Sequence, residues 1–448
     1  MSLSDGLKPS VNPRVALTKK QWPNCVSTDC SDKPIKTPEA NIVTRPKILF
    51  VAEAVSLAHL LRSITLARTL DATAYDIHIA CGEQYALFRH DFPWTHHRLK
   101  SISADAFIGR MARGLPTYTP AELERYAQDD LALLRQVKPD LIISDFRISL
   151  NVSARHLGIP LFNLSNAHWS SLLPERPMPL PDLWLAHILR PWISNLIFQT
   201  VWPVALPIHL YPINRLRRKY GQAPYRSIHA CYCDGDTTLY ADAPVLIPLP
   251  EQHPQHHFLG PVVWKPEQPE FPTWWAEAAA TTGRRAYLTL GSTGKSDVLP
   301  TVVASCQAHG IISLVSTAGR KNFVSAPPSV YASQFLPGGE TAALSDLVIC
   351  NGGSATAHQA LAEGRPILGI CSNMDQLLTM ESIERAGAGL YLRATDANRK
   401  RLEKAIGRLL NEPGFSESAR KTQAGFAEYD ARRRFPAIIA AALGKAGG

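Results

Sequence analysis

The residues best suited to a chemical task lie in the segment 351–376. An apolar run ends there in a Gly-Gly turn at 352–353, and Ser354 or Thr356 then caps a helix. Unpaired backbone N–H groups and the positive end of the helix dipole meet at such a turn, so an anionic diphosphate is its natural ligand. Taken alone, the pattern is also typical of an ordinary strand, turn and helix.

The next strand of this segment ends in Asn373-Met374-Asp375-Gln376. A carboxylate accepts hydrogen bonds, and a carboxamide both donates and accepts them. Asp375 and Gln376 are therefore candidates for binding the hydroxyl groups of a sugar.

A second loop, Gly291-Ser-Thr-Gly-Lys-Ser296, follows a strand and ends like a phosphate-binding P-loop. A Walker A loop needs a glycine where this chain has Thr289, and the loop is too short to wrap a phosphate chain. An ATPase is therefore disfavoured. The Gly-Ser turn can still offer backbone N–H groups and a hydroxyl to a phosphate.

Strands and helices that alternate along the chain must position these loops, which predicts doubly wound, parallel α/β sheets. The expected strands are 46–51, 75–80, 140–144, 159–164, 286–290, 311–316, 347–350 and 366–370. The expected helices between them are 59–70, 149–157, 297–308 and 356–363, and a helix-rich tail covers roughly 400–445.

The composition of the 448 residues, 45% hydrophobic and 19% charged, excludes disorder and coiled coil as the main state. The net charge of +9 suits anionic ligands or an anionic membrane surface better than nucleic acid. Eight cysteines are too few for a disulfide scaffold, and the start MSLSDGLKPS shows no secretory signal. We therefore expect a reduced, cytoplasmic protein.

Several histidines and cysteines could suggest a metal site: His229, Cys231, Cys233, His253, His256 and His257. They lack a second ordered ligand pair, and the last three lie in a Pro-rich stretch. We interpret those three as solvated linker histidines and expect no metal.

Five short motifs carry a resemblance to a known family. They are the Gly-Gly turn, Ala360-Leu361, Gly364-x-Pro366, Asp375-Gln376 and Gly387-Ala-Gly389. Their order resembles the donor-binding signature of nucleotide-sugar glycosyltransferases, the GT-B enzymes of glycosyltransferase family one (the UDP-glycosyltransferase superfamily). Three further motifs look like that family's linker motif, first C-domain loop and turn beside the nucleotide base: Phe258-Leu-Gly-Pro261, Leu290-Gly-Ser292 and Phe335-Leu-Pro337. The resemblance is specific over about 258–392 and diffuse over 46–250.

The resemblance implies a GT-B fold, with two Rossmann-like α/β domains that face a central cleft. The C-terminal helices of such a fold pack back on the N-terminal domain. The expected parts are a flexible leader at 1–45, an acceptor-binding α/β domain at 46–250, an interdomain linker at 251–285, a nucleotide-sugar-binding α/β domain at 286–425 and a C-terminal helix at 426–448.

The resemblance also implies an inverting, metal-independent hexose transfer from a UDP-sugar, or a dTDP-sugar, as co-substrate and without another cofactor. The donor-binding candidates are Gly291, Ser292, Thr293, Phe335, Pro337, Asn351, Gly352, Gly353, Ser354, Ala355, Thr356, Gln359, Asp375 and Gln376. Two of them depart from the family pattern. Asn351 stands where the family usually has a His that contacts the diphosphate, and Gln359 where it has a Glu that binds the ribose.

For catalysis the family implies a His base after the first strand, oriented by an Asp further along the chain. The matching residues are His59 and Asp145. The family's Gly-His is Ala58-His59 here, and its following Pro is Arg62. Glu53, in the loop before His59, is a reserve base.

An apolar stretch at 191–208 approaches the length of a membrane span, but we expect Pro203 and Pro207 to break it. Core packing explains the stretch; an acceptor pocket or a membrane-facing flap is the functional alternative. The aromatic residues in and near it favour an apolar, lipid-like or aromatic acceptor with a hydroxyl: Trp169, Trp192, Phe198 and Trp202. Peripheral contact with the inner face of the membrane stays open, as does the oligomeric state.

Two other functions remain as alternatives at this point. A GT-B-fold sugar-nucleotide epimerase would need carboxylate bases in the cleft, and none is seen at the Asn351 loop. A catalytically weak nucleotide-sugar-binding protein would fit the residues Asn351 and Gln359.

Overall fold

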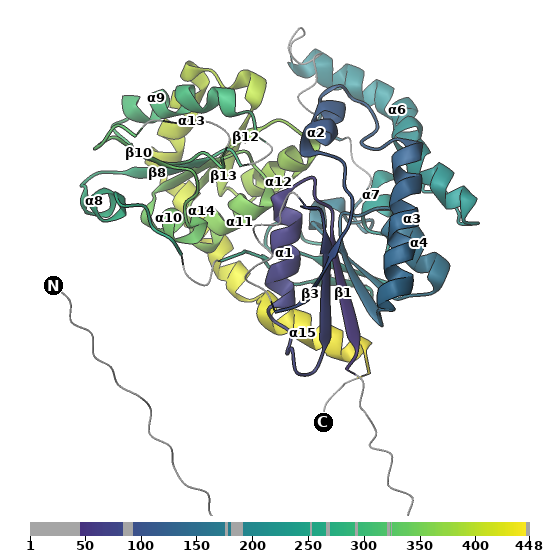
Figure 1. Ribbon diagram of the computed structural model, residues 1–448. Helices are drawn as coiled ribbons and strands as arrows, with labels where there is room; N and C mark the ends of the chain where they lie inside the picture. Colours follow the sequence, from purple (N-terminus) through teal and green to yellow (C-terminus); the bar gives the residue numbers. More distant parts are fainter. Residues whose placement is uncertain are drawn as a thin grey trace, which may run out of the picture. The chain divides into compact units, whose positions relative to one another are not determined.

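The computed structural model describes most of the chain beyond the leader (Figure 1). The described residues are 45–83, 93–174, 178–180, 191–250, 253–265, 269–291, 294–319, 323 and 325–444. Residues 1–44 of the predicted leader and residues 445–448 of the predicted C-terminal helix therefore lie outside the described residues, as do Ser292 and Thr293.

The N-terminal half forms a parallel sheet with the strand order β3-β2-β1-β4-β5-β6-β7. Its strands are β1 (Lys47–Ala52), β2 (Asp76–Cys81), β3 (Thr95–Arg98), β4 (Leu141–Asp145), β5 (Leu161–Ser165), β6 (Thr237–Tyr240) and β7 (His256–Phe258). Its helices include α1 (Leu57–Ala67), α2 (Ala104–Ala112), α3 (Pro120–Val137), α4 (Leu150–Leu157), α6 (Pro191–Lys219) and α7 (Ile228–Tyr232). The central strands are apolar because helices cover both of their faces.

The C-terminal half forms a second parallel sheet, with the strand order β10-β9-β8-β11-β12-β13. Its strands are β8 (Arg285–Thr289), β9 (Ile312–Ser316), β10 (Val330–Ser333), β11 (Leu347–Cys350), β12 (Ile367–Cys371) and β13 (Gly389–Arg393). Its helices are α8 (Trp275–Ala280), α9 (Leu299–Ala308), α10 (Gly338–Leu344), α11 (Ser354–Ala362), α12 (Met374–Arg385), α13 (Arg399–Asn411) and α14 (Pro413–Ala427). The doubly wound α/β architecture expected from the sequence is confirmed.

Each sheet has one point at which the strand order reverses direction along the chain. It lies between β1 and β4 in the first sheet and between β8 and β11 in the second. Ligands of open α/β sheets bind beside the carboxyl ends of the strands at such a point. The topology therefore selects the loops after β1, β4, β8 and β11 as the places for a site.

The last helix, α15 (Ala431–Ala442), returns to the N-terminal sheet (Figure 1). Phe435 and Ile439 are fully buried in one cluster with Ile48 and Phe50 of β1. The ring centroids of Phe50 and Phe435 lie 6.1 Å apart. The prediction that the C-terminal helices pack back on the N-terminal domain is confirmed.

Two elements differ from expectation. Helix α6 runs unbroken through Pro203, Pro207 and a third proline, Pro212, so the expected break is wrong. A proline removes one helical hydrogen bond, and the exposed outer side of α6 leaves the freed carbonyl groups within reach of water. In the predicted linker, His256–Phe258 forms the edge strand β7, which pairs with β6. The linker boundaries themselves stay a prediction.

Candidate active site

The predicted base pair meets at the reversal point of the first sheet. Ser56 caps α1 by accepting a hydrogen bond from the Ala58 N–H, which places His59 in the first turn of the helix. Asp145 is the last residue of β4 and pairs in register with Ala52 of β1. The His59 Nδ1 lies 2.7 Å from the Asp145 Oδ1.

The contact with Asp145 assigns one tautomer to the ring. An ionised carboxylate only accepts hydrogen bonds and would repel a bare Nδ1 at 2.7 Å, so we assign the hydrogen to Nδ1 as a donor to Asp145. The Arg62 Nη2 lies 3.2 Å from the same nitrogen, but it donates to the Asp145 Oδ1. The other nitrogen, Nε2, is then the acceptor. The side chain of His59 is 18% exposed, whereas that of Asp145 is fully buried. A substrate can therefore reach the imidazole, but it cannot reach the carboxylate.

Phe146 supports the imidazole from one side. Its ring stacks on that of His59, with centroids 5.2 Å apart and planes 5° from parallel. Phe146 has a backbone φ of 64°, in the left-handed region that residues other than glycine rarely adopt. Such a conformation costs of order 1–3 kcal/mol and persists where the surroundings hold it.

Arg62 completes the environment of the carboxylate. It lies one turn after His59 on α1 and binds Asp145 with two parallel hydrogen bonds, Nε to Oδ2 at 2.9 Å and Nη2 to Oδ1 at 2.7 Å. Burial alone would raise the pKa of Asp145. The charge of Arg62 and the hydrogen bonds from His59 and Arg62 outweigh it and hold this pKa below its ordinary value. Asp145 is therefore ionised at neutral pH.

A chain of buried hydrogen bonds connects Arg62 to the second domain. Its Nη1 donates to the Asn166 Oδ1 at 2.8 Å, and the Asn166 Nδ2 donates to Asp242 at 3.2 Å. The Asp242 Oδ1 lies 3.1 Å from the Nε2 of His358 on α11. The Ser354 hydroxyl, also on α11, lies 3.5 Å from the Asn166 Oδ1. The residues around the base and the helix predicted to bind the donor thus form one network.

Glu53, the reserve base, lies deeper in the domain. It is fully buried, and its carboxylate contacts the Arg147 Nη1 at 3.3 Å and accepts a hydrogen bond from the Tyr126 hydroxyl at 3.2 Å. Burial raises its pKa in spite of the charge of Arg147. A substrate cannot reach Glu53 in this position, and the geometry favours His59 as the base.

The predicted diphosphate turn follows β11, at the reversal point of the second sheet. Gly352 has a φ of 80°, and a Cβ there would lie 2.7 Å from the Cys371 Sγ, so only glycine fits. The Asn351 Oδ1 accepts a hydrogen bond from the Gly353 N–H at 3.1 Å and fixes the turn. The expected Ser354 or Thr356 cap is wrong, because Gly353 is the N-cap and no side chain caps α11.

The loop after β8 lies against this turn. A Cβ added to Gly291 would lie 3.3 Å from the Asn351 Nδ2, and one added to Gly294 would lie 3.0 Å from the Asn351 Cβ. Two glycine turns and the uncapped start of α11, including Ala355, therefore lie together. Backbone N–H groups and a helix dipole in this arrangement suit an anion.

Asp375 lies in the first turn of α12 and reaches the first domain. Its Oδ1 accepts hydrogen bonds from the His168 Nε2 and the Trp169 Nε1, each at 2.9 Å. Burial raises the pKa of Asp375, but these two bonds and the nearby cations outweigh it and lower the pKa to about 2. The side chain is still 46% exposed, which leaves room for a ligand.

The remaining residues that were predicted to bind the nucleotide sugar differ in their contacts and in their exposure. The Gln376 Oε1 accepts hydrogen bonds from the backbone and side chain of Ser372, and its side chain is buried. The Gln359 amide donates to the Trp264 carbonyl at 3.4 Å and lies against Gly338. Phe335 is 60% exposed, and Pro337 is the N-cap of α10. Their roles in binding stay predictions.

The aromatic residues predicted for the acceptor lie on two elements. Trp169 belongs to a short 3-10 helix after β5, Ala167–Trp169, and is 7% exposed. Phe198 and Trp202 lie on α6 with ring centroids 5.4 Å apart, and both pack against a core cluster with residues from both domains. Trp192 is also in α6, but its side chain lies outside the description. Acceptor binding by these residues stays a prediction.

The reading of His256 as a solvated linker residue is wrong. Its Nδ1 lies 2.6 Å from the Tyr240 hydroxyl, and burial, with the neighbouring His253 and His257, lowers its pKa to about 4. Among the described residues, no group of three or more His, Cys, Asp or Glu could hold a metal ion.

Four residues of this site were not predicted from the sequence: Asn166, His168, Asp242 and His358. Arg62 was predicted only as a departure from the family pattern. Asn166 and His168 directly follow β5, so the rule that selects strand ends could have found them. Asp242 follows β6 in the same way. The partners of these residues are remote in sequence and could not be inferred from spacing.

The turn geometry predicts the effect of the substitution Gly353→Val. Gly353 has a φ of −70°, which any residue adopts, and a Cβ would lie 3.3 Å from the Asn351 Oδ1, so the variant should fold. The new side chain would occupy the space that a diphosphate needs. We expect calorimetry to show affinity for UDP and dTDP at least tenfold weaker, about 1.4 kcal/mol.

Gly414→Val is the matched control, because nothing lies within 4 Å of a Cβ at this position. It should bind the nucleotides like the parent protein. Unchanged nucleotide affinity in a folded Gly353→Val variant would place the diphosphate elsewhere.

The position of Asp375 predicts that its substitution affects the binding of the nucleotide sugar and of the free nucleotide to different extents. Asp375→Ala should weaken the affinity for the intact nucleotide sugar more than the affinity for the free nucleoside diphosphate, because the carboxylate is assigned to sugar hydroxyls. Calorimetry with both ligands measures the difference. Trp169→Phe is the control, because it removes one hydrogen bond to Asp375 and keeps the carboxylate. Equal losses for the two ligands in Asp375→Ala would contradict the assignment.

Comparison with known proteins agrees with this geometry. Residues 299–441 match the family model described as the C-terminal domain of erythromycin biosynthesis protein CIII-like proteins. A PGL/p-HBAD biosynthesis rhamnosyltransferase of Mycobacterium bovis (strain BCG / Pasteur 1173P2) is 36% identical over 383 residues, which cover 85% of this chain and 84% of that protein. A PGL/p-HBAD biosynthesis glycosyltransferase of Mycobacterium tuberculosis (strain ATCC 25177 / H37Ra) is 37% identical over 399 residues, which cover 88% and 92%.

A solved structure shows the same fold at lower sequence similarity. The spinosyn rhamnosyltransferase SpnG, in complex with thymidine diphosphate, superimposes with a TM-score of 0.61 at 17% identity, over 88% of this chain and 99% of that one. The relatives cover most of the chain at more than a third identity. This chain therefore belongs to the GT-B glycosyltransferases of family one, the UDP-glycosyltransferase superfamily.

Proposed function

We propose that the enzyme transfers rhamnose, with inversion, from a dTDP- or UDP-linked donor to a hydroxyl of an apolar, phenol-containing acceptor. The observation that carries the proposal is the His59 pair, whose accessible ring has its Nδ1 bound to a buried carboxylate at 2.7 Å. The sugar and the type of acceptor are suggested by the relatives, which are named for rhamnosyl transfer and for PGL/p-HBAD biosynthesis.

In the proposed reaction, the His59 Nε2 takes the proton of the acceptor hydroxyl, and the oxygen of that hydroxyl attacks the anomeric carbon of the donor sugar. The bond from that carbon to the diphosphate oxygen breaks at the same time, and the electron pair leaves with the nucleoside diphosphate. Asp145 stabilises the imidazolium that forms. Attack from the face opposite to the leaving group inverts the anomeric carbon.

The leaving diphosphate gains negative charge as the bond breaks. The uncapped N–H groups at the start of α11 and its dipole can stabilise this charge. Asn351 can add a hydrogen bond, but it cannot add the charge that the family's usual histidine supplies. We therefore propose that helix α11 stabilises the leaving diphosphate here without the charge that a histidine would add.

The acceptor would lie between the exposed face of His59 and the aromatic side chains of Trp169, Phe198 and Trp202. Such rings suit a phenol, because aromatic pairs gain about 0.5–1.5 kcal/mol beyond the burial of area. The proposal requires no metal and no cofactor besides the nucleotide sugar. Unchanged activity after addition of EDTA would support a reaction without a metal ion.

The test is an incubation of the whole protein with dTDP-rhamnose or UDP-rhamnose, with and without an alkyl p-hydroxybenzoate as the acceptor. We expect release of nucleoside diphosphate only when the acceptor is present, and a glycoside whose anomeric configuration, read by NMR, is opposite to that of the donor. His59→Ala is the negative control.

Two outcomes would replace the proposal. A nucleotide sugar altered without acceptor would indicate an epimerase. Tight binding without turnover, over a panel of lipid and aromatic alcohols, would indicate a nucleotide-sugar-binding protein. Retention of the anomeric configuration would reject His59 as the base of a single displacement.

A further inference from the structure

Helix α6 carries a continuous stripe of exposed apolar side chains. Along the sequence they alternate in steps of four and three, which keeps them on one face of a helix. Each is between 38% and 69% exposed: Ile197, Val201, Val204, Ile208 and Tyr211. The same steps continue to Arg215 and Arg218, which are also exposed. We call these seven residues the α6 stripe; it is apolar over its first part and basic at its end.

The opposite face of α6 is fixed to the domain. Leu210, Ile213 and Leu216 are at most 4% exposed and belong to the same buried cluster as Leu123 and Tyr126 of α3. The stripe therefore points outward because the other side of the helix is held in the core. A monomeric soluble protein rarely exposes a contiguous apolar patch of this kind without a partner.

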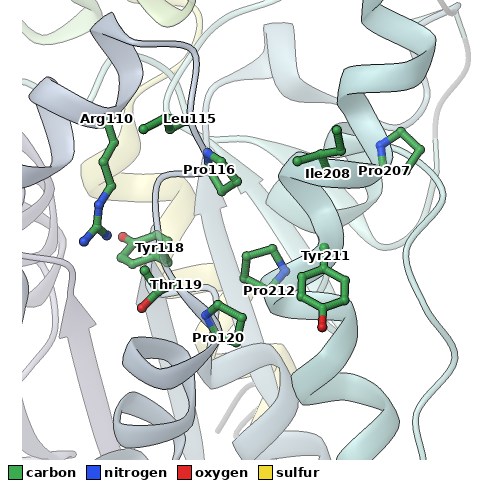
Figure 2. A pocket seen from close by; sticks show the side chains of 10 residues that line it. All are labelled: Arg110, Leu115, Pro116, Tyr118, Thr119, Pro120, Pro207, Ile208, Tyr211 and Pro212. Carbon is green, nitrogen blue, oxygen red and sulfur yellow. The ribbon is translucent and has the colours of Figure 1, made fainter.

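An apolar groove lies beside the stripe (Figure 2). It encloses about 460 Å³ between Ile208 and Tyr211 of α6 and the loop from Leu115 to Pro120. Leu115 is 46% exposed on its rim. The groove widens the apolar surface beyond one helix and offers room for part of an acyl chain.

Helix α6 is long and apolar enough, by length and composition, to cross a membrane from Leu196 to Lys219. Its buried contacts with α3 oppose a crossing, because the helix cannot leave the domain without exposing that core. The three internal prolines add carbonyl groups that need water or headgroups as partners, which the hydrocarbon interior lacks. A helix that lies in the membrane–water interface keeps its buried contacts with α3, and it leaves the carbonyl groups freed by the prolines within reach of water or headgroups.

We propose that the α6 stripe and the adjoining groove form a docking surface for an anionic lipid bilayer, on which α6 lies parallel to the membrane plane. The apolar part of the stripe would enter the boundary between headgroups and acyl chains. Arg215 and Arg218 would contact anionic headgroups, each a favourable charge at such a surface. The proposal concerns a surface outside the catalytic centre and does not depend on the sugar or on the base.

Charge complementarity favours a bilayer over a second copy of the chain. In a parallel pair of α6 stripes, Arg215 and Arg218 would face the same residues of the partner and repel them. In an antiparallel pair they would lie against the apolar residues of the partner. A bilayer has both an apolar layer and an anionic layer, and the chain carries a net charge of +9.

The experiment is cosedimentation of the whole protein with two kinds of vesicle, phosphatidylcholine alone and phosphatidylcholine mixed with phosphatidylglycerol. We expect binding to the mixed vesicles. The triple variant Val201→Ser/Val204→Ser/Ile208→Ser should lower the partition coefficient at least tenfold. The double variant Arg215→Gln/Arg218→Gln should lower it about tenfold on mixed vesicles and leave the weak binding to neutral vesicles unchanged.

Matched controls lie on other exposed surfaces. Lys400→Gln/Lys404→Gln removes two exposed basic residues of α13, and Phe271→Ser removes an exposed apolar residue. Neither should change vesicle binding. Circular dichroism and the melting temperature check the fold of every variant.

Several results would overturn the proposal. One is a parent protein that fails to bind the mixed vesicles. Another is a loss of binding in the controls as large as that in the stripe variants. A third is a dimer, seen by analytical ultracentrifugation, that the triple variant dissociates while vesicle binding is retained, because the stripe would then bind a second copy.

Discussion

The substitution His59→Ala is expected to lower kcat about 10²–10⁴-fold, the usual contribution of a general base. The imidazole is the accessible titratable group beside a buried, ionised carboxylate, and its removal leaves the acceptor hydroxyl without a proton acceptor. Nucleotide affinity should not change, because His59 belongs to the first domain and the diphosphate turn to the second. Initial rates with saturating donor and acceptor, together with calorimetry for the nucleotide, measure both quantities.

Asp145→Asn should lower kcat by a large part of the factor expected for His59→Ala. An amide can donate a hydrogen bond to Nδ1, which moves the ring proton to Nε2 and removes the base from the side of the substrate. The double variant should be only slightly slower than His59→Ala, because the two residues act as a unit. Additive losses would contradict that coupling.

Glu53 provides the decisive control. It is fully buried and bound to Arg147 and Tyr126, so Glu53→Gln should keep turnover within a small factor of the parent. If Glu53→Gln abolishes turnover and His59→Ala keeps it, the proposed base is wrong, although the enzyme remains a glycosyltransferase.

Much of the fold and part of the site could be predicted from local patterns. Apolar runs set the central strands, and the glycine pair directly after one of them marked the Gly352 turn. The pair of His59 and Asp145 was predicted from the family resemblance. These features depend on residues that are near one another in the sequence or on a rule of sheet topology. The close contact of His59 with Asp145 follows from two neighbouring parallel strands, β1 and β4.

The remaining features depend on contacts between distant segments. Asn166 binds Arg62 across 104 residues, and Trp169 binds Asp375 across 206 residues. No periodicity carries that information. The continuity of α6 was missed for a related reason, because its buried residues Leu210, Ile213 and Leu216 pack against the distant helix α3, and this support is not visible in the local sequence.

Arg62→Leu is the second substitution with a large expected effect. Arg62 is 7% exposed and holds both oxygens of a fully buried carboxylate, so its removal leaves an uncompensated charge inside the domain. Breaking a buried ion pair in this way costs about 3–5 kcal/mol of the free energy of unfolding. Urea unfolding at neutral pH measures the loss. Arg62→Lys, which keeps the charge but not the paired hydrogen bonds, should lose less.

Arg155→Leu is the matched control. Arg155 also binds an aspartate, Asp234, at 2.7 Å, but the Arg155 side chain is 47% exposed, and Arg217 still binds the Asp234 carboxylate at 3.0 Å when Arg155 is removed. We therefore expect a loss near that of a surface ion pair, roughly 0–1 kcal/mol. A loss in Arg62→Leu no larger than in this control would show that Asp145 does not depend on Arg62.

The effect of pH separates charge from packing in Arg62→Leu. In the parent protein the pKa of Asp145 lies below its ordinary value, so its ionised form stabilises the fold above the pKa of the unfolded chain, about 3.9, and this contribution is lost as the pH falls through the lower native value. Removal of Arg62 takes away the largest contribution that opposes burial, so we expect the pKa of Asp145 in the variant to rise above the unfolded value. The variant should then lose stability as the pH rises from about 3.9 through that raised native pKa, a range above the one in which the parent changes. The stability difference between the two proteins should therefore be smallest in acid, where Asp145 is protonated in both, and should reach its full size at neutral pH. A difference that stays constant with pH would mean that Arg62 stabilises the domain by packing alone, and that His59 alone holds the Asp145 carboxylate.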